Sequence, residues 1–457
     1  MKKHLLLSLT CLLLIVGCEE EPVYVREYHD EYLLTSISVS PREINLNAGN
    51  LSETLSITNH GDSLLNLRLI HSSELELNIT EPEIAPGESV QITINAEQDQ
   101  ILTDSISTQV SILFKEDSIH IPVNIKLLET NKLILPFDII EALYDKELNR
   151  IIITTSGQAD FYLRCLTSTG SVTDSLVLDH YPNCMDVSAD GTKVIIGQDD
   201  RISVIDLTNM SIINEYSMPC TINEILLAPN HYAYAFSDSE EGAYSVNLTT
   251  DEITSYEYPE LIDQGMRGQL HPSGDYLYLA TNHWVPDDLV KMDIRNGSAE
   301  YIFESPMGSI YEFRGNLWIT SDGEKIITAS GVVLNSTESQ ATDMSYHGTL
   351  ENDDKITAFC ESESSGRVYV ITKKIYNHQP KESSIQFYNS NYLNFLGEIE
   401  IAPFVRPLSN NNMEYVSAIA HQVFLSPDDN ELIVISHAEP GSGLKHTWGI
   451  ESIPLNQ

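Results

Sequence analysis

The stretch CMDVSADGTKVIIGQDDRISVIDLTNMSIINEYSM (residues 184–218) decides the fold expected for most of this chain. It contains four short runs rich in apolar and β-branched residues, and the Asp190-Gly191 pair separates the first run from the second. Short apolar runs bounded by turn residues are typical of strands that pair with their neighbours in the chain. The stretch therefore predicts one four-stranded antiparallel unit.

Copies of this unit recur through residues 132–457. The turn residues Asn149, Gly191, Asn230, Gly274, Gly323 and Gly366 are separated by 42, 39, 44, 49 and 43 residues. These intervals are close to the roughly 40–50 residues of one propeller blade. With a seventh copy at residues 425–436, we predict a seven-bladed β-propeller with an insertion near residues 401–420. Eight blades are the alternative if the insertion contains a further blade.

The early strand at residues 133–139 is expected to complete the last blade, because such closure removes open sheet edges. The segment QLHPSGDYLYLATN (269–282) resembles the repeats of YVTN-type and WD-type propellers. The resemblance covers residues 132–457. It implies a fold without implying a function, because the Gly of the motif serves a turn and its apolar run packs in the core.

A smaller domain is predicted for residues 34–129, where about six short segments alternate apolar and polar residues between turns. This pattern indicates an antiparallel β-sandwich. The segments LSITNHGDSLL (55–65) and PEIAPGESVQITI (82–94) resemble turns of BACON-like and related immunoglobulin-like domains. That resemblance implies a spacer, with an adhesion or carbohydrate-associated module as the alternative. The expected fold class is all-β.

The N-terminus carries Lys2 and Lys3, an apolar run over residues 5–16, and Cys18. The run is shorter than the roughly 20 residues that span a bilayer, so it is read as a removable segment. This arrangement resembles a bacterial lipoprotein signal, which implies loss of residues 1–17 and a palmitate-type lipid on Cys18. Residues 18–33 are then an acidic tether.

The three glutamates at residues 19–21 resemble the export signal of Bacteroidetes-type surface lipoproteins. The resemblance implies an outer-membrane lipoprotein on the surface of a Gram-negative bacterium. Retention on the inner leaflet is the alternative.

Composition restricts the possible partners. The chain has 25 basic and 67 acidic residues, a formal net charge of −42, and such a surface repels nucleic acid. No sequence motif indicates a metal site or a cofactor site. Outside residues 1–18 there are four cysteines, for which disulfides and buried free thiols are both open: Cys165, Cys184, Cys220 and Cys360.

Three residues are candidates for ligand binding. MRGQLHPSG (266–274) and FRGNLWITSDG (313–323) each place Arg-Gly before an inner strand, so Arg267 and Arg314 are expected to flank one channel mouth and hold a carboxylate or sulfate. The alternative is that each arginine pairs with an acidic residue of a neighbouring blade. Trp284, in a loop of the fourth blade, is expected to contact a sugar ring or a protein partner.

The remaining tryptophans, Trp318 and Trp448, are predicted to lie in the core. The sequence favours a lipid-anchored binding protein whose partner is a glycan or an envelope protein, and it leaves the oligomeric state open. A lactonase-like hydrolase is a second hypothesis, which requires Arg267, Arg314, a histidine and a carboxylate to meet. A structural subunit of an outer-membrane assembly is a third, and it predicts an exposed apolar patch.

Overall fold

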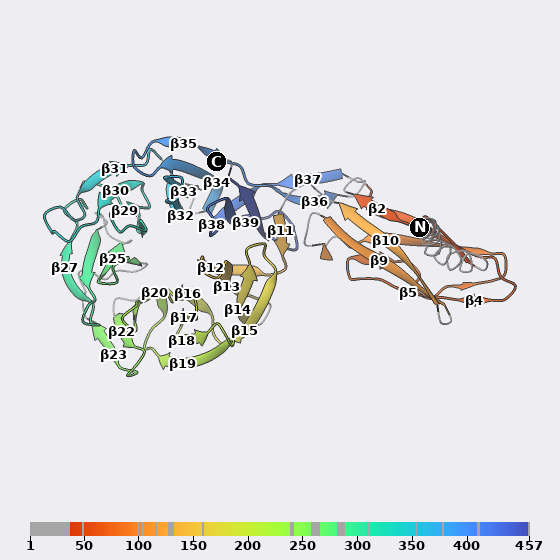
Figure 1. Cartoon of the computed structure of the whole chain (residues 1–457), viewed down its shortest axis with the longest axis horizontal. Helices are drawn as coiled ribbons and strands as arrows, with labels where there is room; N and C mark the ends of the chain where they lie inside the picture. The colour runs from red at the N-terminus through yellow and green to blue at the C-terminus, as the bar shows by residue number, and fades with distance from the viewer. Residues whose placement is uncertain are drawn as a thin grey trace, which may run out of the picture. The chain divides into compact units, whose positions relative to one another are not determined.

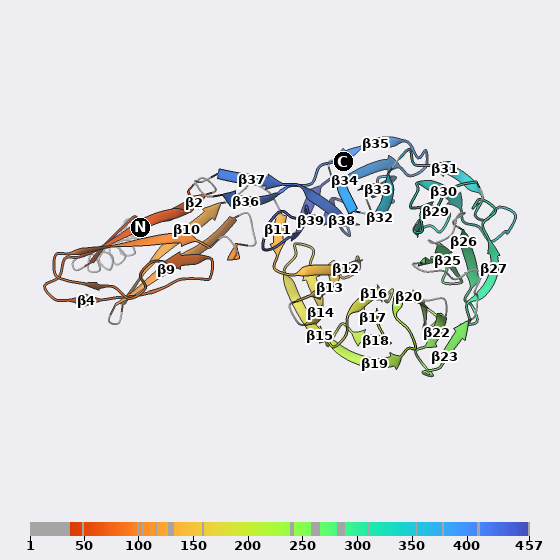
Figure 2. The same cartoon turned by 180° about the vertical axis from the view of Figure 1, so that it is seen from behind.

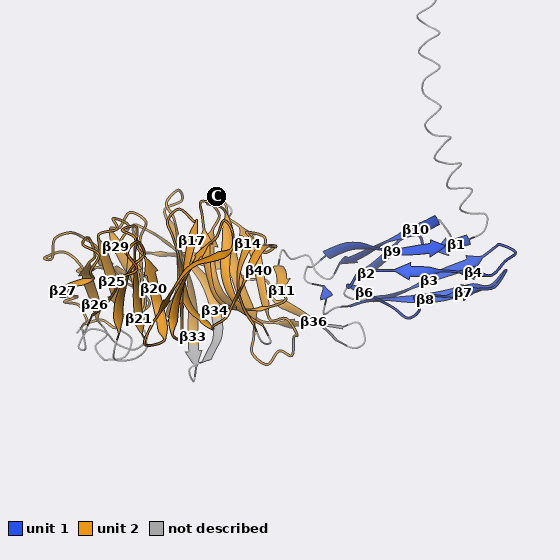
Figure 3. Cartoon of the chain, turned by 90° about the horizontal axis from the view of Figure 1, so that it is seen from below, with its two compact units in different colours: residues 1–129, 407–413 blue, residues 130–406, 414–457 orange. Residues whose placement is uncertain are grey.

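The computed structural model describes residues 37–455 except 48–49, 98–99, 102–104, 115–116, 127–131, 158–159, 238–241, 257–265, 281–287, 309, 353, 377–378 and 409–411. All regular elements in this described part are β-strands, which confirms the prediction of an all-β chain. No helix in it is long and apolar enough to cross a membrane. Contacts divide the chain into two compact units, residues 1–129 with 407–413 and residues 130–406 with 414–457 (Figure 3).

In the first unit, two four-stranded sheets share one apolar core. One sheet has the order β1-β3-β8-β6, the other has the order β2-β10-β9-β5, and β4 pairs with β7. The strands are β1 (Ile37–Ser40), β2 (Ile44–Asn47), β3 (Ser52–Asn59), β4 (Leu65–Asn66), β5 (Arg68–Ile70), β6 (Leu75–Leu77), β7 (Glu83–Ile84), β8 (Ser89–Ala96), β9 (Ser105–Phe114) and β10 (Asp117–Lys126). Leu55 and Ile57 of β3 are fully buried, because alternate side chains of a strand face the same side.

Seven four-stranded sheets make up most of the described part of the second unit and form a ring (Figures 1 and 2). The first three are β12 (Asp138–Asp145), β13 (Arg150–Ser156), β14 (Phe161–Thr167) and β15 (Val172–Leu178); β16 (Pro182–Val187), β17 (Lys193–Gln198), β18 (Arg201–Asp206) and β19 (Ser211–Ser217); and β20 (Ile222–Leu227), β21 (Tyr232–Ser237), β22 (Ala243–Asn247) and β23 (Ile253–Tyr256).

The next three sheets are β24 (Arg267–Leu270), β25 (Tyr276–Ala280), β26 (Leu289–Asp293) and β27 (Glu300–Glu304); β28 (Leu317–Ile319), β29 (Lys325–Thr328), β30 (Val332–Asn335) and β31 (Tyr346–Thr349); and β32 (Lys355–Ser362), β33 (Arg367–Tyr376), β34 (Gln379–Asn389) and β35 (Phe395–Ile399). The seventh is β38 (Ala418–Leu425), β39 (Glu431–Ala438), β40 (Trp448–Pro454) and β11 (Lys132–Leu135). Within residues 401–420, β36 (Phe404–Leu408) pairs with β37 (Asn412–Val416).

The first strand of each sheet lies toward the middle of the ring, as β12, β16 and β20 do in Figure 1, and the fourth strands lie at the rim. Neighbouring sheets touch mainly through these first strands. In five sheets the first strand carries a one-residue irregularity near its start, at Ile140, Asn183, Asn223, Thr357 and His421. A bulge of this kind changes the direction in which the neighbouring side chains point. Glu141, Glu224 and His421 lie at or beside these bulges.

The ring is closed by β11, which pairs with β40 from the other end of the unit. Lys132, the first residue of β11, is buried, and its Nζ lies 3.1 Å from Glu451 Oε1. The same ammonium donates hydrogen bonds to Ser436 Oγ at 2.9 Å and to the Ala402 carbonyl. It also lies 4.5 Å from the centre of the Phe404 ring. The closing strand is therefore fixed by a buried, multiply bonded charge.

Replacing Lys132 by Met should lower the free energy of unfolding by about 3–5 kcal/mol, because Glu451 is left buried without its partner. The matched control is Lys146→Met, since Lys146 is half exposed and pairs with Asp429 at 2.9 Å. That loss should stay below about 1 kcal/mol. Urea unfolding of the two variants checks the difference, and equal losses would contradict the special role of Lys132.

Candidate functional site

Arg267 opens β24, with 44% of its side chain exposed. Its Nη1 donates to Glu224 Oε2 at 2.6 Å and to the Asn223 carbonyl at 3.2 Å. The second oxygen of Glu224 accepts a hydrogen bond from the backbone N–H of Gly268 at 3.1 Å. The guanidinium is thus paired with an acidic residue of the preceding sheet. This is the alternative to ligand binding that the sequence left open for Arg267.

Glu224 belongs to a row of carboxyl groups on the first strands of three consecutive sheets, with Asp186 on β16 and Glu141 on β12. Asp186 Oδ2 accepts a hydrogen bond from the Leu227 N–H at 2.7 Å, and Glu141 accepts one from the Met185 N–H. The inner edge of a first strand has no further strand to bond its backbone. Each carboxyl therefore supplies acceptors to the next sheet.

These carboxyl groups hold protons at unusually high pH. Burial, with the nearby charge of Glu224, raises the pKa of Glu141 to about 8, and burial raises that of Asp186 to about 7. Burial also raises the pKa of Glu224, although Arg267 opposes this. Glu141 Oε2 has no hydrogen-bond partner within the described residues. The cluster joins the sheets while keeping Glu141 protonated at neutral pH.

The stability of the second unit should depend on pH through Glu141. Its pKa when folded lies above the unfolded value of roughly 4.3, so stability falls as pH rises from about 4.5 through about 8, by at most about 1.4 kcal/mol per pH unit. Glu141→Gln keeps the shape and removes this ionisation. Thermal unfolding across that range should show the stability of the variant increasing relative to that of the wild type as pH rises. Parallel curves would show that Glu141 does not titrate there.

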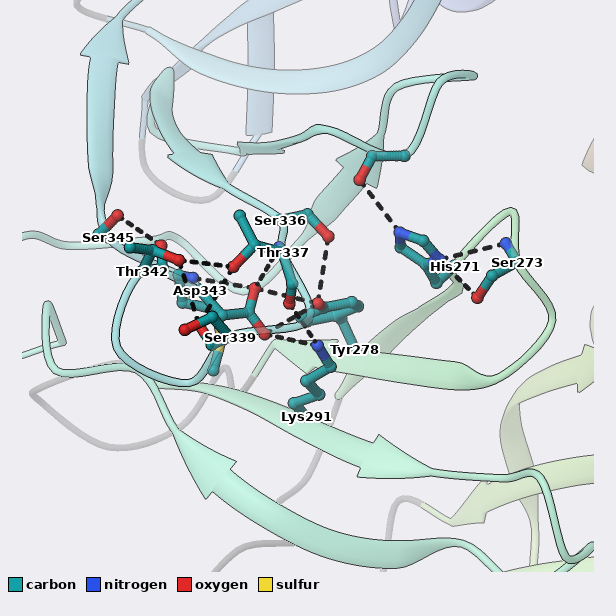
Figure 4. Close-up of polar contacts among 12 residues, drawn as sticks. His271, Ser273, Tyr278, Lys291, Ser336, Thr337, Ser339, Thr342, Asp343 and Ser345 are labelled. Carbon is teal, nitrogen blue, oxygen red and sulfur yellow. Dashed lines mark hydrogen bonds and ion pairs between the residues drawn. The ribbon is translucent and has the colours of Figure 1, made fainter.

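A second buried charge joins the fourth and fifth sheets (Figure 4). Asp343, fully buried, accepts hydrogen bonds from Lys291 Nζ at 2.6 Å and from the Tyr278 hydroxyl at 3.1 Å. The backbone N–H groups of Thr337 and Met344 donate to Asp343 Oδ1 at 3.0 and 3.1 Å. Both oxygens are satisfied by the protein itself, so this cluster fastens two sheets and leaves no free group for a ligand.

A pocket of about 430 Å³ opens in the seventh sheet beside the first. Three neighbouring strands each contribute one ring to it: His421 from β38, His437 from β39 and Trp448 from β40. The ring centroids of His421 and Trp448 are 5.0 Å apart with perpendicular planes, and those of His437 and Trp448 are 5.2 Å apart. The remaining lining residues are Ile139, Ala438, Glu439, Pro440, Gly441, Ser442, Gly443, Leu444 and Thr447.

Both histidines are uncharged at neutral pH. Burial, assisted by the charge of Lys373, lowers the pKa of His421 to about 3, and burial also lowers that of His437. His437 Nδ1 donates to the Ala438 carbonyl at 3.0 Å, which leaves Nε2 as an acceptor. The ring nitrogens of His421 bond to nothing within the described residues, whereas His271 bonds both Gly323 and Ser273 (Figure 4).

The loop over the pocket has a fixed shape. Gly441 and Gly443 have φ values of 83° and 71°, which favour glycine. A Cβ on Gly443 would lie 2.7 Å from Arg406 Nη1, and that same nitrogen donates to the Ser442 carbonyl. Arg406 is itself paired with Glu414. The pocket wall is therefore held in place without a ligand.

No family model and no curated protein matches this chain. Among solved structures, it is similar to the β-propeller domain of Cps50 (Swd1) from Myceliophteria thermophila, with a TM-score of 0.50 and 13% sequence identity. The match covers 70% of this chain and 98% of that domain. The second unit is a β-propeller. The predicted propeller is confirmed, and at this identity the likeness concerns the fold alone.

The propeller places the two arginines at different positions. Arg314 has a φ of 60° and lies three residues before β28, whereas Arg267 is already in a strand. In the fifth sheet Leu317 pairs with Thr328, and in the fourth sheet Gly268 pairs with Leu279. These two pairs occupy the same position in their sheets. The residue that corresponds to Arg267 is therefore Asn316, and the expectation of matched positions for the arginines was wrong.

The sequence spacing already distinguishes the two arginines, since Arg314 lies nine residues before the turn glycine Gly323 and Arg267 lies only seven residues before Gly274. No histidine within the described residues hydrogen-bonds Arg267 or Glu224, so the hydrolase arrangement is not assembled around this pair. Within the part of the chain that the structure describes, no group of three metal-binding side chains is close enough to hold a metal ion.

The other sequence candidates differ in where they lie. Cys18 and Trp284 are outside the described residues, and their roles stay predictions. Trp318 and Trp448 are both half-buried and both pack against the core, Trp318 beside Phe359, and Trp448 also lines the pocket. The four cysteines are free thiols, with Cys165 and Cys184 buried.

Proposed function

We propose that this chain is a lipid-anchored binding protein of a bacterial cell envelope, whose propeller takes its ligand in the pocket of His421, His437 and Trp448. The observation that carries the binding role is His421, a neutral ring with no hydrogen-bond partner in the described part of the chain, held against Trp448 in a preformed pocket. A volume of about 430 Å³ falls within the roughly 300–1,000 Å³ of small-molecule sites.

The architecture in this proposal is an immunoglobulin-like spacer followed by a seven-bladed propeller. The seven four-stranded sheets in the described residues support the blade count, as does the pairing of β11 with β40. The two sheets around one core in the first unit support an immunoglobulin-like domain. Lipid on Cys18 would attach the chain to the outer membrane, with a glycan or an envelope protein as its partner.

Binding is tested with solubilised envelope from the native host passed over immobilised protein. Trp448→Ala should weaken capture at least about tenfold, because truncating a central aromatic anchor commonly costs 2 kcal/mol or more. The control is Trp318→Ala, which removes a ring that packs on the core at a distance from the pocket lining. Unchanged capture by Trp448→Ala, with normal folding, would contradict the proposed site.

Anchoring is tested at Cys18. Cells grown with labelled palmitate should label the wild-type protein, and Cys18→Ser should abolish the label and release the chain from the membrane fraction, since a serine hydroxyl offers no thiol for lipidation. Cys11→Ser is the matched control, because Cys11 lies within the segment expected to be removed. Label retained by Cys18→Ser would refute lipidation at this residue.

A structural role in an envelope assembly is a second candidate, favoured by exposed apolar side chains on the outermost strands of six sheets. They are Val172, Val177, Ile212, Ile213, Ile253, Tyr301, Tyr346, Phe395 and Leu396, each at least 39% exposed. For this role, Ile213→Asp should shift the protein from a large to a small species when detergent extracts are sized, while Trp448→Ala should not. The pocket proposal expects no such shift.

A further inference from the structure

The pocket of His421, His437 and Trp448 is built to receive hydroxyl groups. A neutral imidazole offers one N–H donor and one acceptor nitrogen, and at His421 neither is bonded within the described residues. His437 adds an acceptor at Nε2, because its Nδ1 is already bonded to the Ala438 carbonyl. A hydroxyl group both donates and accepts, so neighbouring hydroxyls of one ligand match this pair. A hydrocarbon ligand would leave the ring nitrogens unsatisfied.

The aromatic part of the lining requires a ligand with an apolar face as well. Trp448 is half-buried, and the ring of His421 stands at 90° to it, so the indole is held in one orientation by its neighbours. Aromatic rings in binding sites bury apolar surface at little cost in side-chain freedom. The C–H face of a pyranose ring combines an apolar surface with surrounding hydroxyls.

The charges around the pocket favour an uncharged ligand. Glu439 lines the pocket and the whole chain carries a net charge of −42, so an anionic ligand is repelled. The charge of Lys373, which helps to lower the pKa of His421, opposes a cationic group close to that ring. Both histidines are neutral at physiological pH, so the lining itself supplies no compensating positive charge.

From these contacts we infer that the pocket binds an uncharged saccharide, with a sugar ring against Trp448 and its hydroxyls on His421 and His437. The inference rests on the proposed binding function and names its ligand class. The geometry is set before binding, because Arg406 holds the Ser442 carbonyl and Gly443 leaves room for the guanidinium. Such pre-organisation lowers the cost of ordering the site around the ligand.

The test is calorimetric titration of the full chain with methyl glycosides of neutral hexoses and the matching disaccharides. Glucosamine, sialic acid and choline serve as charged probes. At least one neutral sugar should bind saturably, at least tenfold more tightly than any charged probe. Trp448→Ala and His421→Ala should each weaken it tenfold or more, and Trp448→Phe should retain part of the affinity. Tighter binding of a charged probe would overturn the saccharide assignment.

Ser442→Phe provides a variant that blocks the pocket from its surface loop without altering the core rings. It should abolish sugar binding while leaving the unfolding temperature unchanged, and full binding by this variant would overturn the assignment to this pocket. If no neutral sugar binds but envelope capture still depends on Trp448, the saccharide inference is wrong and the proposed binding function stands. If capture is also independent of Trp448, both are wrong.

Discussion

Pairing of β11 with β40 is the interaction on which the second unit depends. A ring of sheets needs its last sheet to include a strand from the beginning of the ring, since otherwise one sheet edge stays open. Lys132 fixes this junction by placing a buried ammonium against Glu451, Ser436 and the Ala402 carbonyl. The pocket lies in this same closing sheet, and closure of the ring adds Ile139 of the first sheet to its wall.

Between the other sheets, buried polar groups satisfy backbone atoms that the sheets leave unpaired. Asp186 and Glu224 accept hydrogen bonds from the next sheet, and Asp343 is bonded by both Lys291 and Tyr278. Such groups are stable in the interior because their hydrogen bonds are complete. Glu141 Oε2 and the ring nitrogens of His421 both lack a partner within the described residues, but His421 also lines a pocket, which is why function is assigned to the pocket and not to the charged clusters.

Local pattern predicted the strands well and the site poorly. Turn pairs such as Asp190-Gly191 mark the repeat, because their backbone requirements are set by adjacent residues. The Arg-Gly match at Arg267 and Arg314 gave a wrong prediction of matched positions. Arg314 lies two residues further from its turn glycine than Arg267 does, so the two arginines differ in strand position. The sequence predicts Trp448 to lie in the core, and the structure shows that a side chain packed on the core can also line a pocket.

The sequence by itself determined the all-β class, the repeat and the propeller, since side-chain alternation and turn chemistry act over a few residues. The tertiary structure decided which residues meet. Strand pairing across the seventh sheet brings His421, His437 and Trp448 together, and ring closure adds Ile139 from the first sheet. No spacing along the chain encodes that meeting, because it depends on strand order and on contacts between distant segments.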